Sequence, residues 1–410
     1  RDRLRSRGLG DVYKRQVCQY YYPEPVRITD ICEELVEMGH EVTVLTGVPN
    51  YPMGTIYEGY RGKAHREEKI NGVNIIRCFT IGRRTGIFWR ILNYFSYPLS
   101  SGMKVKKLDK DFDVVFVNQL SPVMMAHAAI KYKKRYHKKM VLYCLDLWPE
   151  SMEVGGIKKG TILYKIFHLV SQKIYLQVDK LMVTSRMFDE YFYNEFGIPK
   201  NEIAYLPQYA ENFFENVEGK LKQEEGYHLM FAGNIGVAQS VNTIIEAAYI
   251  LKEHKDIFFH IVGDGIALEN CQKLVEKYKI NSVKFYGRKP VNEMPEFYDM
   301  ADAMLVTMID NPTISKTLPG KVQTYMAAAK PIIGAINGET QYVIESAKCG
   351  YCGKAESPKE LAENILKFVI SDKKDEYAKN AREYYQKNFT KEKFMNKLAS
   401  ELCKQGMKNM

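Results

Sequence analysis

The sequence predicts an α/β protein with two domains, each built around a parallel β-sheet. Apolar runs typical of strands alternate with amphipathic runs typical of helices from residue 17 onward. The alternation weakens in a polar stretch at residues 207–226, which predicts a linker, and then restarts. The chain has 410 residues, which is too long for one ordinary hydrophobic core and suits two domains.

The first domain is expected over residues 17–206. Asn71-Gly72 predicts the turn of a β-hairpin within it. An apolar face formed by Ile28, Ile31 and Leu35 predicts the first helix. Strands are expected at residues 17–20, 41–46, 114–118, 140–145 and 180–184, with further helices ending near residue 136 and starting near residue 162.

The second domain is expected over residues 227–370, followed by charged helices at residues 371–410. A helix at residues 241–251 has a regular apolar face. Strands are expected at residues 227–232, 258–262, 283–286, 303–307 and 331–334.

The first sixteen residues are expected to lie outside the fold. They hold six Lys or Arg and two Asp, show no hydrophobic period, and resemble translated sequencing-adaptor sequence. Without them the formal charge of +10 falls to about +6. This excess suits an anionic lipid surface or a phosphorylated substrate. The sequence contains no recognisable nucleic-acid module, which argues against a nucleic-acid partner.

Composition predicts a cytoplasmic protein without a metal centre. The eight cysteines are scattered, which favours a reducing compartment. Cys349 and Cys352 form one C-x-x-C without a second pair, and the histidines lack metal-ligand spacing. No apolar run reaches the roughly 18 residues of a membrane-spanning helix.

Three glycine-containing loops follow predicted strands of the second domain. Glycine lets the backbone approach a ligand closely, and loops at the carboxyl ends of parallel strands meet at one edge of the sheet. We therefore expect nucleotide binding there, although the first loop has G-x-x-G spacing and could instead be a tight turn without a ligand. The expected binding residues are Gly233, Asn234, Gly236, Gln239, Gly263, Asp264, Gly265 and Arg288.

A fourth polar segment precedes a helix that is expected to begin near Lys321. Lys316, Thr317, Lys321 and Thr324 are expected to cluster near the start of that helix. A lysine beside a helix N-terminus suits a phosphate group. The alternative is that Lys321 is a solvated lysine of the first helical turn.

With these loops in this order, the sequence resembles the GT4 family of retaining glycosyltransferases, in particular bacterial O-antigen and capsule enzymes assigned as L-fucosamine transferases. The resemblance covers most of residues 17–400 and implies a GT-B architecture, in which two Rossmann-like domains face an inter-domain cleft and the C-terminal helices pack back toward the first domain. It rests on residues 21–54 (from YYPEP to NYPMG), 146–151 (DLWPES), 231–239 (FAGNIGVAQ), 262–265 (VGDG), 285–305 and 317–333.

The resemblance implies a UDP-sugar donor bound mainly by the second domain, no cofactor and no metal. The implied reaction moves a sugar, such as an N-acetylated deoxyhexosamine, to a lipid-diphosphate-linked glycan in cell-surface polysaccharide synthesis, at the inner face of the membrane. The rival functions are a UDP-sugar 2-epimerase with the same fold and a nucleotide-sugar-binding protein without catalysis.

Two acidic positions of the family are replaced in this chain. Lys316 and Thr324 stand where many members carry a pair of glutamates, so the usual carboxylate contact with the ribose is missing. Gln239 stands where many members have a basic residue, and Pro25-Val26-Arg27 stands where many have glycines. These departures leave the contacts with ribose and phosphate open.

Carboxylates for the reaction are expected from the first domain. Asp146 and Glu150 follow its fourth strand and suit an acceptor hydroxyl or proton transfer, with capping of the next helix as the alternative. We expect Asp146 to be catalytic and Glu150 to support it, while Arg288, Lys316 and Lys321 stabilise the departing diphosphate. The loop Asn50–Gly54 is expected to shape the acceptor pocket or to be a plain loop.

Residues 83–100 mix basic and aromatic side chains and predict a docking segment for an anionic membrane surface. The alternative is a helix packed on its own domain. A second basic run at residues 131–139 is typical of a solvated helix end.

Overall fold

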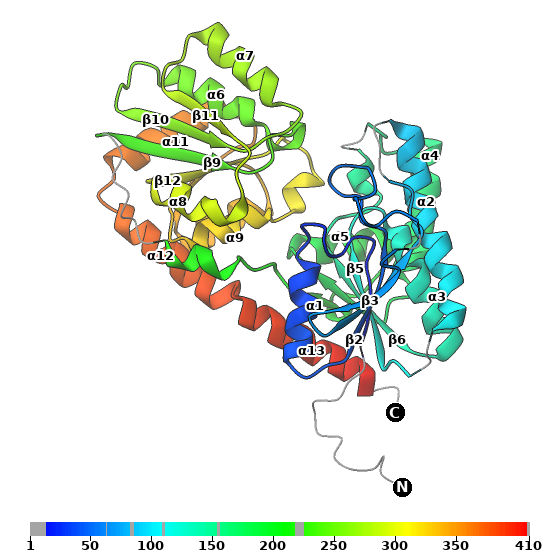
Figure 1. The fold of residues 1–410 in the computed structure, drawn as a ribbon. Coiled ribbons are helices and arrows are strands. Elements are labelled where there is room, and N and C mark those ends of the chain that lie inside the picture. Colours follow the sequence, from blue (N-terminus) through cyan, green and yellow to red (C-terminus); the bar gives the residue numbers. More distant parts are fainter. Residues whose placement is uncertain are drawn as a thin grey trace. The chain divides into compact units, whose positions relative to one another are not determined.

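The computed structural model describes residues 14–62, 64–82, 86–108, 111–153, 156–217 and 225–407. The chain divides into two compact units, and Figure 1 shows that each is a β-sheet flanked by helices. The first unit extends to Thr184 and includes Phe188–Leu206 and the chain from Met395; the second contains Ser185–Met187 and Pro207–Phe394. The predicted α/β class with two parallel, Rossmann-like sheets is confirmed.

The first unit is built on a sheet with the strand order β3-β4-β2-β1-β5-β6-β7-β8 in the described residues. Only β3 and β4 pair antiparallel, as the predicted hairpin at Asn71-Gly72 requires. The strands are β1 (Lys14–Val17), β2 (Val42–Gly47), β3 (Glu67–Ile70), β4 (Val73–Cys78), β5 (Val114–Gln119), β6 (Lys139–Cys144), β7 (Lys180–Val183) and β8 (Ile203–Tyr205).

Helices cover both faces of this sheet. In Figure 1, α2, α3 and α4 run along one side and α1 lies on the other. The helices are α1 (Ile28–Glu37), α2 (Ile87–Lys104), α3 (His127–Tyr136), α4 (Ile162–Tyr175) and α5 (Met187–Phe196), with short 3-10 turns η1 (Val105–Lys107), η2 (Val123–Ala126), η3 (Glu150–Met152) and η4 (Lys200–Glu202).

Strand β1 corrects the expected start of the fold. It covers Lys14–Val17 and pairs in parallel with β2 and β5, so it is a central strand. The sequence instead predicts a strand at residues 17–20 and a segment outside the fold through residue 16. Strand pairing uses backbone N–H and C=O groups, which every non-proline residue carries, so a strand can form where side chains show no apolar period. Residues 1–13 of the expected leader lie outside the described residues.

The second unit is built on an all-parallel sheet with the order β11-β10-β9-β12-β13-β14 in the part of the chain described. Its strands are β9 (Tyr227–Ala232), β10 (Ile257–Val262), β11 (Val283–Gly287), β12 (Ala303–Thr307), β13 (Ile332–Ala335) and β14 (Gly350–Gly353). Its helices are α6 (Val241–Ile250), α7 (Leu268–Tyr278), α8 (Met294–Asp299), α9 (Gly320–Ala327), α10 (Glu339–Ala347), α11 (Pro358–Ile370) and α12 (Lys374–Asn388), with η5 (Asn212–Asn216), η6 (Val237–Gln239), η7 (Val291–Glu293) and η8 (Ile314–Lys316).

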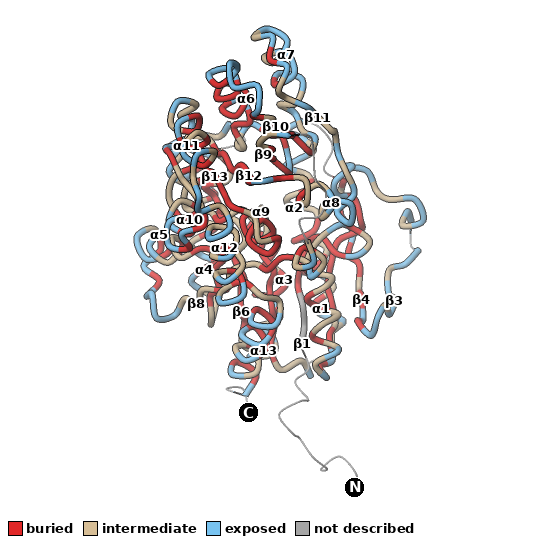
Figure 2. Tube along the Cα trace, turned by 90° about the vertical axis from the view of Figure 1, so that its left-hand side faces the viewer, coloured by how far each residue is buried: buried red, intermediate tan, exposed pale blue. Residues whose placement is uncertain are grey.

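Strands of the second unit bury both faces because successive side chains point to opposite sides. Leu229 and Phe231 of β9 belong to the core beneath α6 and α11, whereas Met230 and Ala232 belong to the core beneath α9 and α12. Figure 2 shows these strands as mostly buried, with exposed residues gathered on outer helices such as α7. The sheet is therefore a rigid frame for the loops at its carboxyl edge.

The end of the chain is divided between the two units. The sequence predicts separate helices at residues 371–410, but α12 contacts α9 and belongs to the second unit. The last helix, α13 (Lys391–Met407), belongs to the first unit from Met395 onward.

No helix within the described ranges combines the length and the apolar character that crossing a membrane requires.

Candidate functional site

The three glycine loops of the second unit are joined to one another by backbone hydrogen bonds. The Gly233 N–H donates to Val262 O at 2.9 Å, and the Gly263 N–H donates to Gly287 O at 2.9 Å. The Ile235 N–H donates to Asp264 O at 2.8 Å. The structure therefore brings the loops after β9, β10 and β11 together at the carboxyl edge of the sheet, where ligands bind in parallel α/β folds.

Gly263 and Gly265 allow these loops to pack closely. Gly263 has φ of +148°, and a Cβ there would lie 1.8 Å from Gly233 O. Gly265 has φ of +158°, and a Cβ there would lie 2.4 Å from Ile235 O. At both positions the atom that would clash with a side chain is a backbone oxygen of the first glycine loop. These two glycines are therefore required for packing between loops, because any Cβ would clash with backbone.

Gly233 differs because a side chain there would meet an ammonium group. Its φ is +138°, and a Cβ would lie 2.9 Å from Nζ of Lys321 in the first turn of α9. That Nζ is buried, makes no hydrogen bond among the described residues, and lies 3.7 Å from the centroid of the Phe231 ring. Burial lowers the pKa of Lys321 to about 7.

A buried ammonium that lacks an acidic partner is unfavourable by itself. The face of the Phe231 ring offers partial electrostatic compensation, through a cation–π contact. An anionic group bound beside Gly233 would supply the missing partner. Lys321 is therefore the expected binding residue whose surroundings most favour a phosphate.

Gln239 and Asn234 hold the first glycine loop in shape. Gln239 Oε1 accepts hydrogen bonds from the Gly236 N–H at 3.2 Å and from Asn234 Nδ2 at 3.0 Å. The Gln239 carbonyl accepts from the Thr307 hydroxyl at 2.7 Å. The Gln239 amide oxygen therefore supports the loop, in which Asn234 is exposed and Gly236 is buried.

The remaining expected donor residues lie in different surroundings. The Thr324 hydroxyl is buried, donates to Lys321 O at 2.9 Å and lies 3.3 Å from the Tyr298 hydroxyl, so it faces the core and not a ribose. The Thr317 hydroxyl donates to Ile314 O at 2.7 Å. Lys316 is half-buried at the end of η8, whereas Arg288 and Asp264 are exposed.

Asp146 lies at the carboxyl edge of the first sheet, as expected. Its Oδ2 accepts a hydrogen bond from the Ser121 hydroxyl in the loop after β5, and Ser121 Oγ lies 2.9 Å from Ser151 Oγ. The Asp146 carbonyl accepts from Gln119 Nε2 at 2.9 Å. Asp146 is half-buried, which leaves it accessible from solvent while its loop is fixed.

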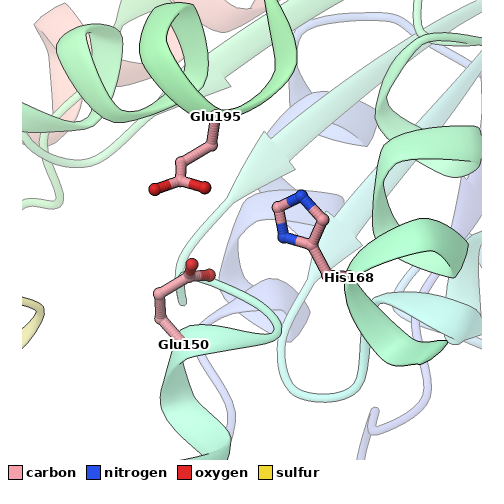
Figure 3. Close-up of side chains that lie close together, drawn as sticks. All are labelled: Glu150, His168 and Glu195. Atoms are coloured by element: carbon pink, nitrogen blue, oxygen red, sulfur yellow. The ribbon is translucent and has the colours of Figure 1, made fainter. Parts of the chain in front are cut away.

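Glu150 is buried and already bound by the protein. Its Oε1 accepts a hydrogen bond from the Tyr164 hydroxyl at 2.7 Å, and its Oε2 accepts one from the Tyr191 hydroxyl. Figure 3 shows Glu150 pointing toward His168 and Glu195. In each of the three side chains one atom that could bind a metal ion lies within 4.8 Å of the other two. Glu195 also pairs with Lys159 at 3.0 Å. Because protein groups occupy both carboxylates, this cluster favours a structural role for Glu150 over contact with a substrate.

Two features escaped the sequence analysis. One is Glu24, a buried carboxylate in the loop after β1 that accepts three backbone hydrogen bonds. It lies within the family-like string YYPEP, but the pattern alone does not separate a buried carboxylate from an exposed one. The other is the set of exposed apolar residues on α4. Their helical spacing in the sequence is the same as that of a buried face, so the sequence does not indicate that they are exposed.

Helix α2 exposes apolar side chains along one stripe. Arg83 and Arg84 of the expected docking segment lie outside the described residues, and Arg90 is exposed. The exposed fractions in the stripe range from 41% to 66%. Its members are Phe88, Ile91, Phe95, Leu99 and Met103.

Helix α4 exposes a second apolar stripe. Trp148, which is buried, packs edge-on against Tyr94 of α2 at 5.6 Å and Phe167 of α4 at 5.8 Å between ring centroids. The two helices therefore share one aromatic anchor and lie on one side of the sheet (Figure 1). The exposed members in α4 are Ile162, Leu163, Ile166 and Leu169, at 40% to 79%.

Sequence comparison relates the two halves of the chain to glycosyltransferase families. The family described as Glycosyltransferase Family 4 matches residues 25–208, and the family described as Glycosyl transferases group 1 matches residues 212–387. A Pseudomonas aeruginosa protein named as a glycosyltransferase, WbjE, is 25% identical over 257 residues, which are 59% of this chain and 62% of WbjE. This chain thus spans less than two thirds of that relative.

A longer match is WcaI of Escherichia coli (strain K12), named as a colanic acid biosynthesis glycosyl transferase. It is 22% identical over 409 residues, covering 93% of this chain and 97% of WcaI. The solved structure of Anabaena Alr3699/HepE in complex with UDP and glucose aligns with a TM-score of 0.69 at 12% identity, covering 95% of this chain and 99% of that one. The chain therefore belongs to the GT4-type glycosyltransferases and has the GT-B fold with two Rossmann-like domains.

Proposed function

We propose that this glycosyltransferase moves a sugar from a UDP-sugar to a lipid-diphosphate-linked glycan, with retention at the anomeric carbon. The observation that carries the donor half is the buried Nζ of Lys321 beside Gly233, which has no hydrogen-bond partner among the described residues. A nucleotide diphosphate is the anion that loops at this edge of a parallel sheet commonly bind. The related Alr3699/HepE structure contains UDP and glucose, which supports a nucleotide-sugar donor.

In the proposed reaction the bond between the anomeric carbon and the diphosphate oxygen breaks, a bond to the acceptor oxygen forms, and the proton of the acceptor hydroxyl passes to the Asp146 carboxylate. The leaving diphosphate gains negative charge, which the Lys321 ammonium stabilises. Asp146 is the proposed acceptor-side carboxylate because it is half-buried at the carboxyl edge of the first sheet. Arg288 and Lys316 remain proposed partners of the diphosphate, and no metal or cofactor is proposed for the step.

The polysaccharide role is proposed from the relatives. WcaI is named for colanic acid biosynthesis, and colanic acid is a cell-surface polysaccharide. We extend this class of product to the present chain. The sugar, such as an N-acetylated deoxyhexosamine, and its linkage are the parts of the proposal that a donor and acceptor screen has to identify.

We also propose that the protein docks at the inner face of the membrane through the stripes on α2 and α4. A lipid-linked acceptor has to be met at a membrane surface. Contiguous exposed apolar side chains on soluble proteins commonly mark interaction sites. The sequences of α2 and α4 contain Arg90, Lys104, Lys165 and Lys173 but no Asp or Glu, so their charge suits anionic lipid.

The deciding experiment is a transfer assay with purified full chain, a panel of UDP-sugars and short-chain prenyl-diphosphate-linked N-acetylhexosamines, read by mass spectrometry. We expect a product one sugar heavier, with the anomeric configuration of the donor, and an unchanged rate in the presence of EDTA. A UDP-sugar that turns over without an acceptor would instead indicate an epimerase. UDP binding without any turnover would indicate a binding protein.

Gly233→Val gives an independent check of the donor site. A branched side chain at φ of +138° would also occupy the space beside Lys321 Nζ. We expect calorimetry to show loss of UDP binding by this variant while the unit stays folded by circular dichroism. Unchanged UDP affinity would remove the first glycine loop from the site.

A further inference from the structure

A single buried carboxylate joins the loops that follow β1 and β2. Glu24 is 4% exposed and lies in the loop after β1. Its Oε1 accepts hydrogen bonds from the N–H groups of Asn50 and Tyr51, both at 2.7 Å, and its Oε2 accepts one from the Tyr21 N–H at 3.0 Å. Asn50 and Tyr51 belong to the loop after β2, so Glu24 fixes the backbone of two loops at once.

The loop that Glu24 holds is also ordered from within. Asn50 is fully buried, and its Nδ2 donates to Val48 O at 2.9 Å. The Gly54 N–H donates to Asn50 O at 2.6 Å, and the Tyr57 hydroxyl donates to Tyr51 O at 2.6 Å. These bonds keep the segment compact, and the Glu24 carboxylate connects it to the loop after β1.

Arg77 of β4 fixes the other side of the contact. Its Nη2 donates to Tyr22 O at 2.8 Å, and the positive charge of its guanidinium group acts on the Glu24 carboxylate. Burial raises the pKa of Glu24 to about 7, although the three N–H donors and Arg77 act in the opposite direction. Keeping an ionised carboxylate at this buried position is therefore energetically unfavourable, and residues with such unfavourable burial are common at functional sites.

The held loops present three exposed side chains at the carboxyl edge of the sheet. Tyr22 and Tyr51 are 40% and 41% exposed, and Met53 is 75% exposed. An aromatic ring with a polar hydroxyl and a flexible thioether together offer apolar and hydrogen-bonding contacts. This combination suits the C–H faces and hydroxyl groups of a sugar ring.

We propose that Glu24 is a positioning residue for the acceptor, because it holds the Asn50–Gly54 loop so that Tyr51 and Met53 form one wall of the site for the acceptor's sugar ring. The inference rests on the proposed transferase function and deepens it by naming what orders the acceptor side. Glu24 acts through the loop backbone and does not contact the acceptor itself.

Kinetics of Glu24→Ala and Glu24→Gln test the proposal, with a prenyl-diphosphate-linked N-acetylhexosamine as the acceptor. Alanine removes all three accepted hydrogen bonds, and we expect the acceptor KM to rise by about tenfold or more while the donor KM changes by less than about twofold. Glutamine keeps an oxygen that can accept from Asn50 and Tyr51, so it should rescue most of the acceptor KM. Equal KM values for the native chain and Glu24→Ala would overturn the proposal.

Hydrogen exchange on the full chain tests the same link without any turnover. The amides of Asn50 and Tyr51 should exchange faster in Glu24→Ala than in the native chain, because both lose their acceptor. If they exchange at the native rate, the link itself is wrong. If exchange rises but neither protein transfers sugar to any acceptor, the proposed transferase function fails while the link stands.

Two further variants separate positioning from general stability. Tyr51→Ala leaves the backbone bond to Glu24 in place and should raise the acceptor KM with native exchange at Asn50. Glu67→Gln removes an exposed carboxylate that pairs with Lys104 in the same unit and should change neither readout. An acceptor KM that Tyr51→Ala leaves unchanged would contradict a wall formed by this loop.

Discussion

Lys321 is distinguished from other lysines by its surroundings and not by its residue type. Many lysines lie in the first turn of a helix with the ammonium in water. This one is turned onto the Phe231 ring and is buried beside a glycine that leaves space for it. Burial without an acidic partner is what lowers its pKa to about 7, and a bound diphosphate would raise that pKa again.

UDP affinity should therefore depend on pH through Lys321. In the free protein the charged fraction of Lys321 falls as the pH rises through about 7, so UDP should bind more weakly at pH 8.5 than at pH 6.5. Lys321→Arg stays charged over this range and should bind with a flatter pH profile. Lys321→Met should bind about tenfold or more weakly at the lower pH, because a charge-assisted contact is lost. Calorimetry at the two pH values measures all three, and parallel profiles for the native chain and the arginine variant would contradict the assignment.

Gly263 and Gly287 provide a matched test of what the glycine loops do. Gly263→Ala places a Cβ 1.8 Å from Gly233 O at a positive φ, whereas Gly287→Ala has a positive φ of +67° with no atom within 4 Å of the new Cβ. We expect Gly263→Ala to lower the free energy of unfolding by about 3 kcal/mol or more, and Gly287→Ala by about 1 kcal/mol. Urea denaturation of both variants measures the difference. Equal losses would show that loop packing at Gly263 is not the reason for glycine.

At the scale of elements, helices α2 and α4 behave unlike ordinary surface helices. Each is anchored by an aromatic residue that meets the buried Trp148, yet each also exposes a stripe of large apolar side chains. The sequence pattern of α4 alone does not reveal this, because its apolar residues are numerous enough for one buried face and one exposed face. Only the packing around Trp148 decides which side is covered.

Charge substitutions on α4 should therefore release the protein from anionic vesicles. We expect the native chain to sediment with vesicles containing phosphatidylglycerol and less with phosphatidylcholine alone, and added salt to weaken this binding. Ile166→Glu combined with Leu169→Glu should reduce binding by more than about tenfold, because apolar area is lost and negative charge is added. Ile370→Glu, on the exposed end of α11 in the second unit, is the matched control. Native binding by the α4 variant would exclude α4 from the docking surface.

At the scale of the whole molecule, each unit has its own sheet and core, so damage to one need not unfold the other. Strand β1 is central in the first sheet, between β2 and β5. Loss of a central strand leaves two neighbours with unpaired backbone groups, which is more costly than loss of an edge strand.

Deletion of residues 1–17 should consequently abolish the cooperative unfolding of the first unit and leave a transition of the second unit. Calorimetry of the full chain, of a chain starting at residue 14 and of a chain starting at residue 18 measures this. The chain that starts at residue 14 keeps β1 and should retain both transitions. A first unit that unfolds cooperatively without β1 would contradict its central place in the sheet.

The sequence by itself determined the fold class and most strand positions, and it named the edge of each sheet at which we expect ligands. These follow from side-chain periodicity and from glycine placement, which are local properties of the chain. The start of β1 and the strand β14, whose residues are Gly350, Tyr351, Cys352 and Gly353, could not be predicted. Their place depends on backbone pairing with neighbours distant in sequence, which side-chain patterns do not encode.

For the candidate site, the sequence pointed to three glycine loops, which the structure joins by backbone hydrogen bonds, and the tertiary structure distinguished among their residues. Lys321 and Thr324 look equally suitable in the sequence. The Lys321 ammonium lies beside Gly233 without a hydrogen-bond partner in the described part of the chain, whereas the Thr324 hydroxyl turns toward Tyr298 in the core. The structure also distinguishes Glu24, which accepts hydrogen bonds from loop backbone, from Glu150, which accepts them from two tyrosine hydroxyls. Burial and hydrogen-bond partners depend on contacts between residues far apart in the sequence. The pattern of a chain states which chemical groups are available, and only packing decides which of them face a ligand.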